Sequence, residues 1–455
     1  MTEHANGVSG ADRNLVRAIG TWGLAASIVN VTVGGGIFRL PASPDLTGRL
    51  GAAAPLAYVA CAIVMLLIVL CIAEAGSRVS LTGGPYAYVE VTFGRFAGFL
   101  VGVMLFVVGC TAMPAVAGML ADAAARLVPW IGTIAGRGVF LAAIFVIVVW
   151  INVVGVRQGT RLNATLTVAK LAPLVLLLVA GLFAVNGDNL RWTEGAPSVG
   201  NLSRASVFAI FAFAGVESAL VPSGEVRDSA RTVPRAVLLA MALVTLLYIG
   251  LQIVAQGVLG AALVGDATPL ASAAGRVFGP AGAALINAGF LVSAFGYLCG
   301  MTLAVPRALF AFGRDGILPR GLASVHPRFH TPWIAIIVQS VLTWILAMTN
   351  GFESLVILSN VSVSMVYLGC AAAAWKLRTT QPVPGAFRVP GGAIVPVLAA
   401  AAILFLLSSV TLKEWSVLAV VVVAAAALYF IAGRSGLAAG RNVAFNDPDQ
   451  TDGRR

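Results

Sequence analysis

Residues 33–41, with the sequence VGGGIFRLP, interrupt the first long apolar stretch of the chain, which runs over 20–47. Glycine loses more backbone entropy on folding than any other residue and is therefore unfavourable inside a helix. Small residues also let helices pack closely, but packing motifs place them four residues apart. Three consecutive glycines at 34–36 instead predict an unwound segment within a membrane helix.

A second interruption lies at residues 211–218 (FAFAGVES), which are followed by Pro222 and Gly224. A helix in lipid satisfies its own backbone hydrogen bonds, so a break at membrane depth is tolerated only where it is buried in protein or lines a cavity. Breaks at corresponding positions in two halves of a chain are typical of a transporter substrate site.

The composition excludes a soluble protein. Of the 455 residues, 59% are hydrophobic and only 10% are charged, whereas a soluble protein carries about a quarter charged residues. The net charge of +11 does not indicate nucleic-acid binding, because the basic residues lie in short loops between apolar runs. The five cysteines all fall inside hydrophobic stretches, so no disulfide framework is expected.

The apolar stretches predict an all-α polytopic membrane protein with about twelve transmembrane helices, since one bilayer crossing needs about 20 apolar residues. Twenty of the 29 Lys and Arg residues fall on the side of the N-terminus and eight on the other. This bias predicts cytoplasmic termini in the cell (inner) membrane, with a cytoplasmic segment at 1–19 and a disordered tail at 434–455. The predicted spans are 20–47, 54–76, 96–121, 138–155, 164–185, 204–224, 234–262, 281–311, 333–349, 354–375, 394–411 and 415–433.

The two interruptions fall in the first and sixth predicted spans, five helices apart. An odd-numbered unit that is repeated in one chain inserts with opposite topology, so two inverted repeats are expected. The first would comprise helices 1–5 (20–185) and the second helices 6–10 (204–375), with helices 11 and 12 following at 391–433.

The breaks also predict what they bind. Backbone amides at the start of the half-helix near Gly35 would attract an anionic group such as a carboxylate. The carbonyls freed just before each break would accept hydrogen bonds from a cation such as an α-ammonium. A zwitterion satisfies both ends.

Four stretches resemble the amino acid–polyamine–organocation (APC) permease superfamily, over roughly residues 15–435. The first is GGGIFRLP (34–41), and the second joins AE (73–74) to GGPYAY (83–88) and FG (93–94). The third runs from FAFAGVES (211–218) to Glu225 and PRA (234–236). The fourth joins PRALFA (306–311) to RDGILP (314–319), with FRVP (387–390) beyond it.

The resemblance implies the leucine-transporter fold, a 5+5 inverted repeat plus two C-terminal helices, and alternating access to amino acids. It implies that the amides of Gly35 and Gly36 hold the substrate carboxylate, and that Phe211 and Glu217 act in gating. The substrate-binding residues that it implies are Thr32, Gly34, Gly35, Gly36, Phe211, Ala214 and Gly215, with the carbonyls of Thr32, Phe211 and Ala214 holding the α-ammonium. The sequence departs from the family pattern at Gly35, where a serine is usual, and at Asp228-Ser229, where Asn-Pro is usual.

Ionisable residues at membrane depth are costly and are candidates for function. Lys170 would either turn inward onto the first break, with Ser293 as a neighbour, or snorkel to the interface. The inward ammonium would stand where sodium-coupled members of the fold bind sodium. Glu217 is central and is expected to act in gating or proton coupling, because desolvation favours its neutral form. Glu74 lies near a helix end, where a structural ion pair is expected.

The sequence favours a transporter over an enzyme. No phosphate loop, nucleophile constellation or paired metal ligands are present, and His326 and His330 lie in an expected cytoplasmic loop at 307–328 and just after it. No cofactor and no metal are therefore expected.

The leading interpretation is a sodium-independent secondary transporter, either a proton-coupled symporter or an exchanger, that moves neutral amino acids. Its partners are the amino acid, protons in the symport case, and membrane lipid; the oligomeric state is left open. Neutral amino acids are favoured because a cationic side chain would lack a dedicated acidic partner. A cationic amino acid or polyamine antiporter is the alternative. An amino-acid sensor without net transport is the third interpretation.

Overall fold

The computed structural model describes residues 20–79, 84–154, 160–192, 195–220, 226–314, 317–329, 331–380 and 385–434. The predictions made for 1–19 and 435–455, and the motif residues Pro222, Gly224 and Glu225, lie outside this part of the chain. Within it the regular elements are helices, as the apolar stretches predict.

The α-helices follow the predicted spans closely, and short 3₁₀ turns join several of them. Their bounds are α2 Thr21–Thr32, α3 Gly36–Arg39, α4 Thr47–Leu50, α5 Pro55–Arg78, α6 Pro85–Phe93, α7 Arg95–Ala125, α8 Ile134–Val154, α9 Thr160–Leu182, α10 Val199–Phe213, α11 Val216–Ala219, α12 Ser229–Leu259, α13 Pro269–Phe278, α14 Pro280–Ala304, α15 Pro306–Arg314, α16 Trp333–Thr349, α17 Phe352–Thr380, α18 Ile394–Leu407 and α19 Leu412–Arg434.

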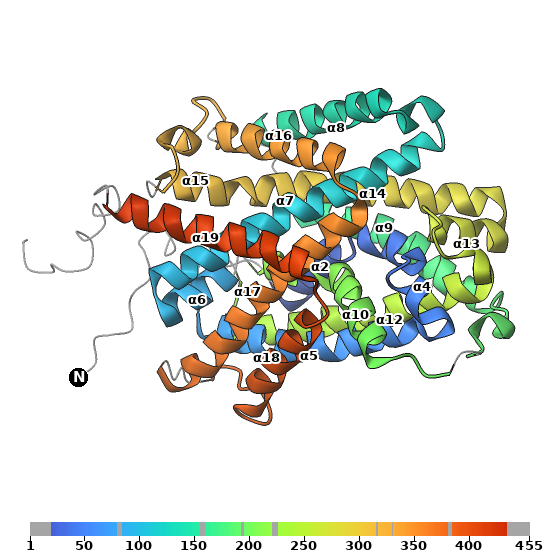
Figure 1. The fold of residues 1–455 in the computed structure, drawn as a ribbon, viewed down its shortest axis with the longest axis horizontal. Coiled ribbons are helices and arrows are strands. Elements are labelled where there is room, and N and C mark those ends of the chain that lie inside the picture. Colours follow the sequence, from blue (N-terminus) through green and yellow to red (C-terminus); the bar gives the residue numbers. More distant parts are fainter. Residues whose placement is uncertain are drawn as a thin grey trace, which may run out of the picture.

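Seven helices in the described residues are long and apolar enough to cross a membrane, and the bent pair formed by α2 and α3 raises this number to eight. Four shorter apolar helices, at Lys170–Leu182, Val199–Phe213, Trp333–Thr349 and Ile394–Leu407, coincide with four more of the predicted spans. Most of the long helices run roughly along the longest axis of the molecule, whereas α17 crosses it obliquely (Figure 1).

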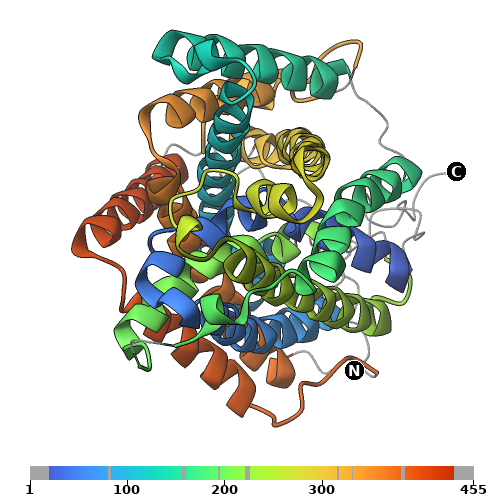
Figure 2. The same ribbon diagram turned by 90° about the vertical axis from the view of Figure 1, so that its right-hand side faces the viewer.

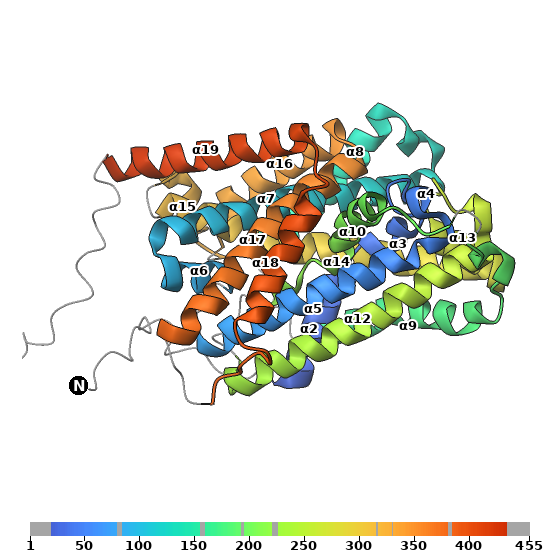
Figure 3. The same ribbon diagram turned by 60° about the horizontal axis from the view of Figure 1, so that its bottom comes forward.

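Burial separates a central set of helices from a peripheral one. In α7 and α17, 72% of the apolar window is buried inside the protein, against 11% in α19 and 22% in α8. The helix α8 lies at the edge of the bundle in two perpendicular views (Figures 1 and 2). The helices α5 and α12 pack side by side, and α2 packs against α12 (Figure 3). The outward apolar faces of α8 and α19 are those expected to meet lipid.

Both predicted helix interruptions are present. The first helix ends at Thr32 and resumes at Gly36 with a bend of 43°. The second ends at Phe213 and resumes at Val216. Between them Gly215 has φ of +124°, a conformation that residues with a Cβ rarely adopt. The two breaks meet, because a Cβ placed on Gly215 would lie 3.2 Å from the backbone nitrogen of Thr32.

Candidate functional site

The freed carbonyls of the first break are taken by side chains of other helices. The Lys170 ammonium, on α9, donates hydrogen bonds to the carbonyls of Asn30 and Val33, the latter at 2.8 Å. The hydroxyl of Ser293, on α14, lies 3.5 Å from the Val33 carbonyl. Lys170 is only 5% exposed. Of the two alternatives drawn from the sequence, the structure has the ammonium turned inward onto the break.

The second break is organised by Glu217. Its two carboxylate oxygens lie 2.9 and 3.0 Å from the N–H of Gly215, which donates to them. In a continuous helix this N–H would donate to the carbonyl of Phe211, four residues earlier. The hydroxyl of Tyr367, on α17, also donates to Glu217 at 2.8 Å. Glu217 therefore caps the half-helix α11 and leaves the Phe211 carbonyl without its helical donor.

Tyr248 joins the two breaks. It lies on α12 and is fully buried, and its hydroxyl is 3.0 Å from the carbonyl of Thr32 and 2.9 Å from that of Ala212. The Thr32 carbonyl also accepts the N–H of Gly34 at 2.8 Å. One of the three carbonyls expected to hold an α-ammonium therefore already has two donors within reach.

The sequence interpretation did not select Tyr248 or Tyr367. Both stand in apolar stretches, where a tyrosine reads as a large hydrophobic residue. The available signal is the hydroxyl, since a buried tyrosine hydroxyl usually has a hydrogen-bond partner. A tyrosine in an apolar stretch therefore predicts a buried hydrogen bond, but it does not predict which helix supplies the acceptor.

The glycines of the first break differ in the space around them. A Cβ on Gly36 would lie 3.0 Å from a ring carbon of Phe211 and 3.3 Å from the Cα of Ala212. A Cβ on Gly35 would lie 3.1 Å from a methyl of Val116. At Gly34 the nearest atom would be a ring carbon of Tyr297 at 3.5 Å, an ordinary contact distance. The close approach of the two breaks therefore depends most on Gly36.

A cavity lies between the breaks and α7, α14 and α17. Its volume is about 30 Å³, well below the range of about 300–1,000 Å³ typical of small-molecule pockets, so the cavity is nearly closed in this structure. The residues predicted from the two breaks all line it: Thr32, Gly34, Gly35, Gly36, Phe211, Ala214, Gly215 and Glu217. Lys170 and Ser293 contact the first break without lining the cavity.

The remaining wall is mostly apolar. It is built by Val31, by Val108, Ala112 and Val116 of α7, by Tyr297 and Met301 of α14, and by Ser359 of α17. The Ser359 hydroxyl is buried and has no hydrogen-bond partner among the described residues. Buried polar groups are normally paired, so this hydroxyl is available to a polar group that enters the cavity.

Glu74 lies outside the cavity and forms the structural ion pair expected from its position. It is fully buried and accepts hydrogen bonds from Arg378 at 2.6 Å and from the backbone N–H of Val389 at 3.2 Å. Arg78 approaches the same carboxylate at 2.9 Å. The contacts tie the last turn of α17 and the residues after it to the end of α5. In the expected cytoplasmic loop, His326 accepts from the backbone N–H groups of Arg328 and Phe329, while His330 lies outside the described residues.

Comparison with known proteins identifies the family to which this chain is similar. The family model described as "Amino acid permease" matches residues 19–436. The serine/threonine exchanger SteT of Bacillus subtilis (strain 168) is 30% identical over 416 residues, covering 89% of this chain and 93% of that protein.

Two further relatives come from the same organism. The methylthioribose transporter is 27% identical, with 93% of this chain and 94% of the relative covered. The branched-chain amino acid permease BcaP is 26% identical, with 87% and 88% covered. The match over nearly the whole chain agrees with the two broken helices and the cavity between them, and the chain therefore belongs to the amino acid permease family of the APC superfamily, as a multi-pass membrane transporter and not an enzyme.

Proposed function

We propose that this protein is a sodium-independent secondary transporter that moves neutral amino acids by alternating access, as a proton-coupled symporter or an exchanger. The substrate carboxylate would bind the amides of Gly35 and Gly36, where the half-helix α3 begins. Its α-ammonium would bind carbonyls freed by the breaks, at Phe211, Ala214 and Thr32.

The observation that carries this proposal is the charge inventory of the cavity. The described residues that line it include no lysine, arginine or histidine. Its one carboxylate, that of Glu217, already accepts hydrogen bonds from Gly215 and Tyr367. A charged substrate side chain would therefore lose its hydration without gaining a counter-ion, which is costly in a low-dielectric site. A neutral side chain meets a mostly apolar wall.

The proposed architecture is that of twelve spans in two inverted repeats, 20–185 and 204–375, followed by two helices at 391–433. The protein would lie in the cell (inner) membrane, with both termini in the cytoplasm. The bent pair, the seven long helices and the four shorter apolar ones support this count. The inversion would let the two breaks meet at the same depth, and the contact between Gly215 and Thr32 supports it.

Lys170 supports sodium independence. A sodium ion at a helix break is held by carbonyl and hydroxyl oxygens. Here the carbonyls of Asn30 and Val33 accept hydrogen bonds from an ammonium that already supplies the positive charge. A second cation at the same oxygens would be repelled by it.

Relatives widen the choice of substrate. Their names cover serine and threonine, branched-chain amino acids and methylthioribose. The side chains of these amino acids are uncharged, and methylthioribose carries no charge. The cationic amino acid or polyamine antiporter stays the runner-up, and a sensor without transport the third interpretation.

The test is a thermal-shift screen of the purified protein, followed by flux into proteoliposomes. The screen uses the twenty amino acids, methylthioribose and putrescine. We expect stabilisation by neutral amino acids and saturable uptake or exchange of the same compounds. Stabilisation by arginine, lysine or putrescine alone would establish the runner-up. Stabilisation without any flux would establish a sensor.

A further inference from the structure

Arg39, the last residue of α3, connects the first break to two other elements. Its guanidinium Nη1 donates to the carboxylate of Asp122, on α7, at 2.7 Å. The guanidinium carbon also lies 5.1 Å from the ring centroid of Phe352, the first residue of α17, in a cation–π arrangement. The sequence interpretation gave Arg39 no role beyond its place in the first motif.

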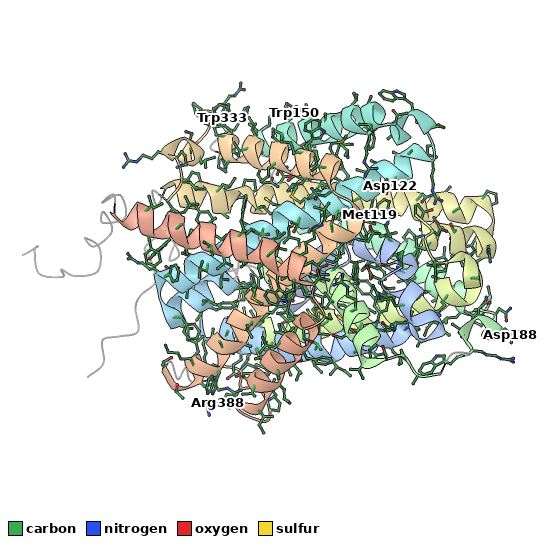
Figure 4. All side chains as sticks on the ribbon, in the orientation of Figure 1. Met119, Asp122, Trp150, Asp188, Trp333 and Arg388 are labelled. Atoms are coloured by element: carbon green, nitrogen blue, oxygen red, sulfur yellow. The ribbon has the colours of Figure 1, made fainter. Side chains whose placement is uncertain are left out.

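Asp122 is held in place independently of Arg39. It lies near the C-terminal end of α7 (Figure 4). Arg137, at the start of α8, donates to its other oxygen at 2.6 Å and to the carbonyl of Gly118 at 3.3 Å. Two contacts to α7 make Arg137 an anchor, whereas Arg39 reaches α7 through a single hydrogen bond. The bond from Arg39 is therefore the one that can break without disturbing the packing of α7 on α8.

Phe352 also contacts Phe211, which lines the cavity. Its ring stands edge-on to that of Phe211, with centroids 5.9 Å apart and an angle of 87° between the planes. Phe211 lines the cavity, and its ring approaches Gly36 at the start of α3. The half-helix α3 thus meets Phe211 at both of its ends, directly at Gly36 and through Phe352 at Arg39.

We infer that Arg39 and Phe352 are positioning residues that hold Phe211 over the cavity, and that the contact of Arg39 with Asp122 is the latch that releases it. The inference rests on the proposed function, in which α3 and Phe211 move during transport. When Arg39 leaves Asp122, Phe352 loses its cation and Phe211 loses its edge-on partner. The cavity then opens on the side where α7 ends and α17 begins, opposite to the start of α2.

The contact between Arg39 and Asp122 is weak enough to break and re-form when the cavity opens and closes. Arg39 and Asp122 are 22% and 29% exposed. Partly exposed ion pairs and single cation–π contacts contribute little, since water and salt screen them. A stronger contact would keep the cavity closed, and a weaker one would leave Phe211 free.

The test measures access to the cavity without any substrate. Ala112 lines the cavity, and Ala112→Cys is introduced where the five native cysteines, all buried, are replaced. An impermeant thiol reagent is applied from the side opposite to the N-terminus. We expect Arg39→Gln and Phe352→Leu each to label about two- to fivefold faster, the ratio expected for one exposed cation–π contact. The double variant should label no faster than the quicker single variant, because both remove one contact.

A matched control is available one turn further along the same end of α7. Arg126 pairs with Asp266 at 3.0 Å, also partly exposed, but no aromatic contact links this pair to Phe211 among the described residues. Burial acts to raise the pKa of Asp266, but hydrogen bonds from Ser272, Thr268 and Arg126 lower it overall, so the control pair stays charged near neutral pH. Arg126→Gln should label at the wild-type rate.

The outcomes separate this inference from the proposed function. Labelling of Arg39→Gln that matches Arg126→Gln, or single effects that multiply in the double variant, would overturn the latch. Where Arg39→Gln does not fold, Phe352→Leu alone tests the latch, and a wild-type labelling rate in that variant also overturns it. Failure of the wild type to bind or move any amino acid would overturn the proposed function alone, because labelling needs no substrate.

Discussion

The hydroxyl of Tyr367 donates a hydrogen bond of 2.8 Å to the carboxylate of Glu217, across 150 residues of sequence. Glu217 also accepts the N–H of Gly215 within the second break. The carboxylate therefore connects the unwound backbone to the middle of α17, and a change in its charge acts on both. This is the arrangement expected of a group that links protonation to movement of the break.

Glu217→Gln keeps the shape of the side chain and removes its charge. We expect substrate binding to survive and exchange of internal for external substrate to persist, because neither requires a proton to be carried. Initial net uptake by the wild type should fall as pH rises, and the curve of the variant should be flat. Tyr367→Phe is the control, since it keeps the carboxyl and with it the pH dependence. Parallel curves for wild type and Glu217→Gln would remove Glu217 from coupling.

Gly36→Ala should weaken substrate binding by about tenfold or more, since overpacking typically costs about 1–3 kcal/mol. The added Cβ would meet Phe211 and the backbone of Ala212, and backbone cannot move aside cheaply. Gly34→Ala is the matched control, because its Cβ would make an ordinary contact at 3.5 Å. Affinities from thermal shift should separate the two. Equal affinity in both variants would show that the close approach at Gly36 does not matter for binding.

Tyr248→Phe should lower the stability of the substrate-free protein by about 1–3 kcal/mol, because two buried carbonyls lose their shared donor. Tyr58→Phe is the control: its hydroxyl is also fully buried but has no hydrogen-bond partner among the described residues, so its loss should be neutral or stabilising. Thermal unfolding in detergent measures both. Substrate should stabilise Tyr248→Phe more than wild type, since the ammonium then fills the vacant place at Thr32. An identical shift would mean that the ammonium binds elsewhere.

Uptake should not require sodium, because the Lys170 ammonium lies at the oxygens that a sodium ion would use. Initial rates in sodium and in choline buffers should agree within error. Lys170→Met, which leaves the carbonyls of Asn30 and Val33 without this donor, should lose most of its uptake in either buffer. A strict sodium requirement in the wild type would rule out the role assigned to Lys170.

Ser359→Ala should reduce the preference for hydroxylated over hydrocarbon side chains, by about two- to tenfold if one neutral hydrogen bond is lost. Ser362→Ala is the control, because Ser362 is equally buried and unpartnered on the same helix but does not line the cavity. Competition between serine and alanine for uptake gives the ratio. An unchanged ratio in Ser359→Ala would show that the substrate side chain points away from α17.

Several features follow from local sequence. The glycines at 34–36 predicted the first break, because a helix through three glycines is costly wherever it lies. The length of each apolar run predicted the helix bounds, since the bilayer sets the length of a span. Glu74 near a helix end predicted a structural ion pair, although its main partner, Arg378, is 304 residues away.

Other features depend on which helices pack together. Tyr248 contacts Thr32 across 216 residues, and Arg39 contacts Asp122 across 83. No local pattern marks these residues, because a tyrosine or an arginine at such a position fits many helix packings. By itself the sequence determined where the backbone leaves the helix and how many apolar segments there are, since backbone entropy and bilayer thickness act on neighbouring residues. Packing alone decided which side chains fill the freed hydrogen bonds, because a buried carbonyl accepts from whichever donor the neighbouring helices bring within about 3 Å.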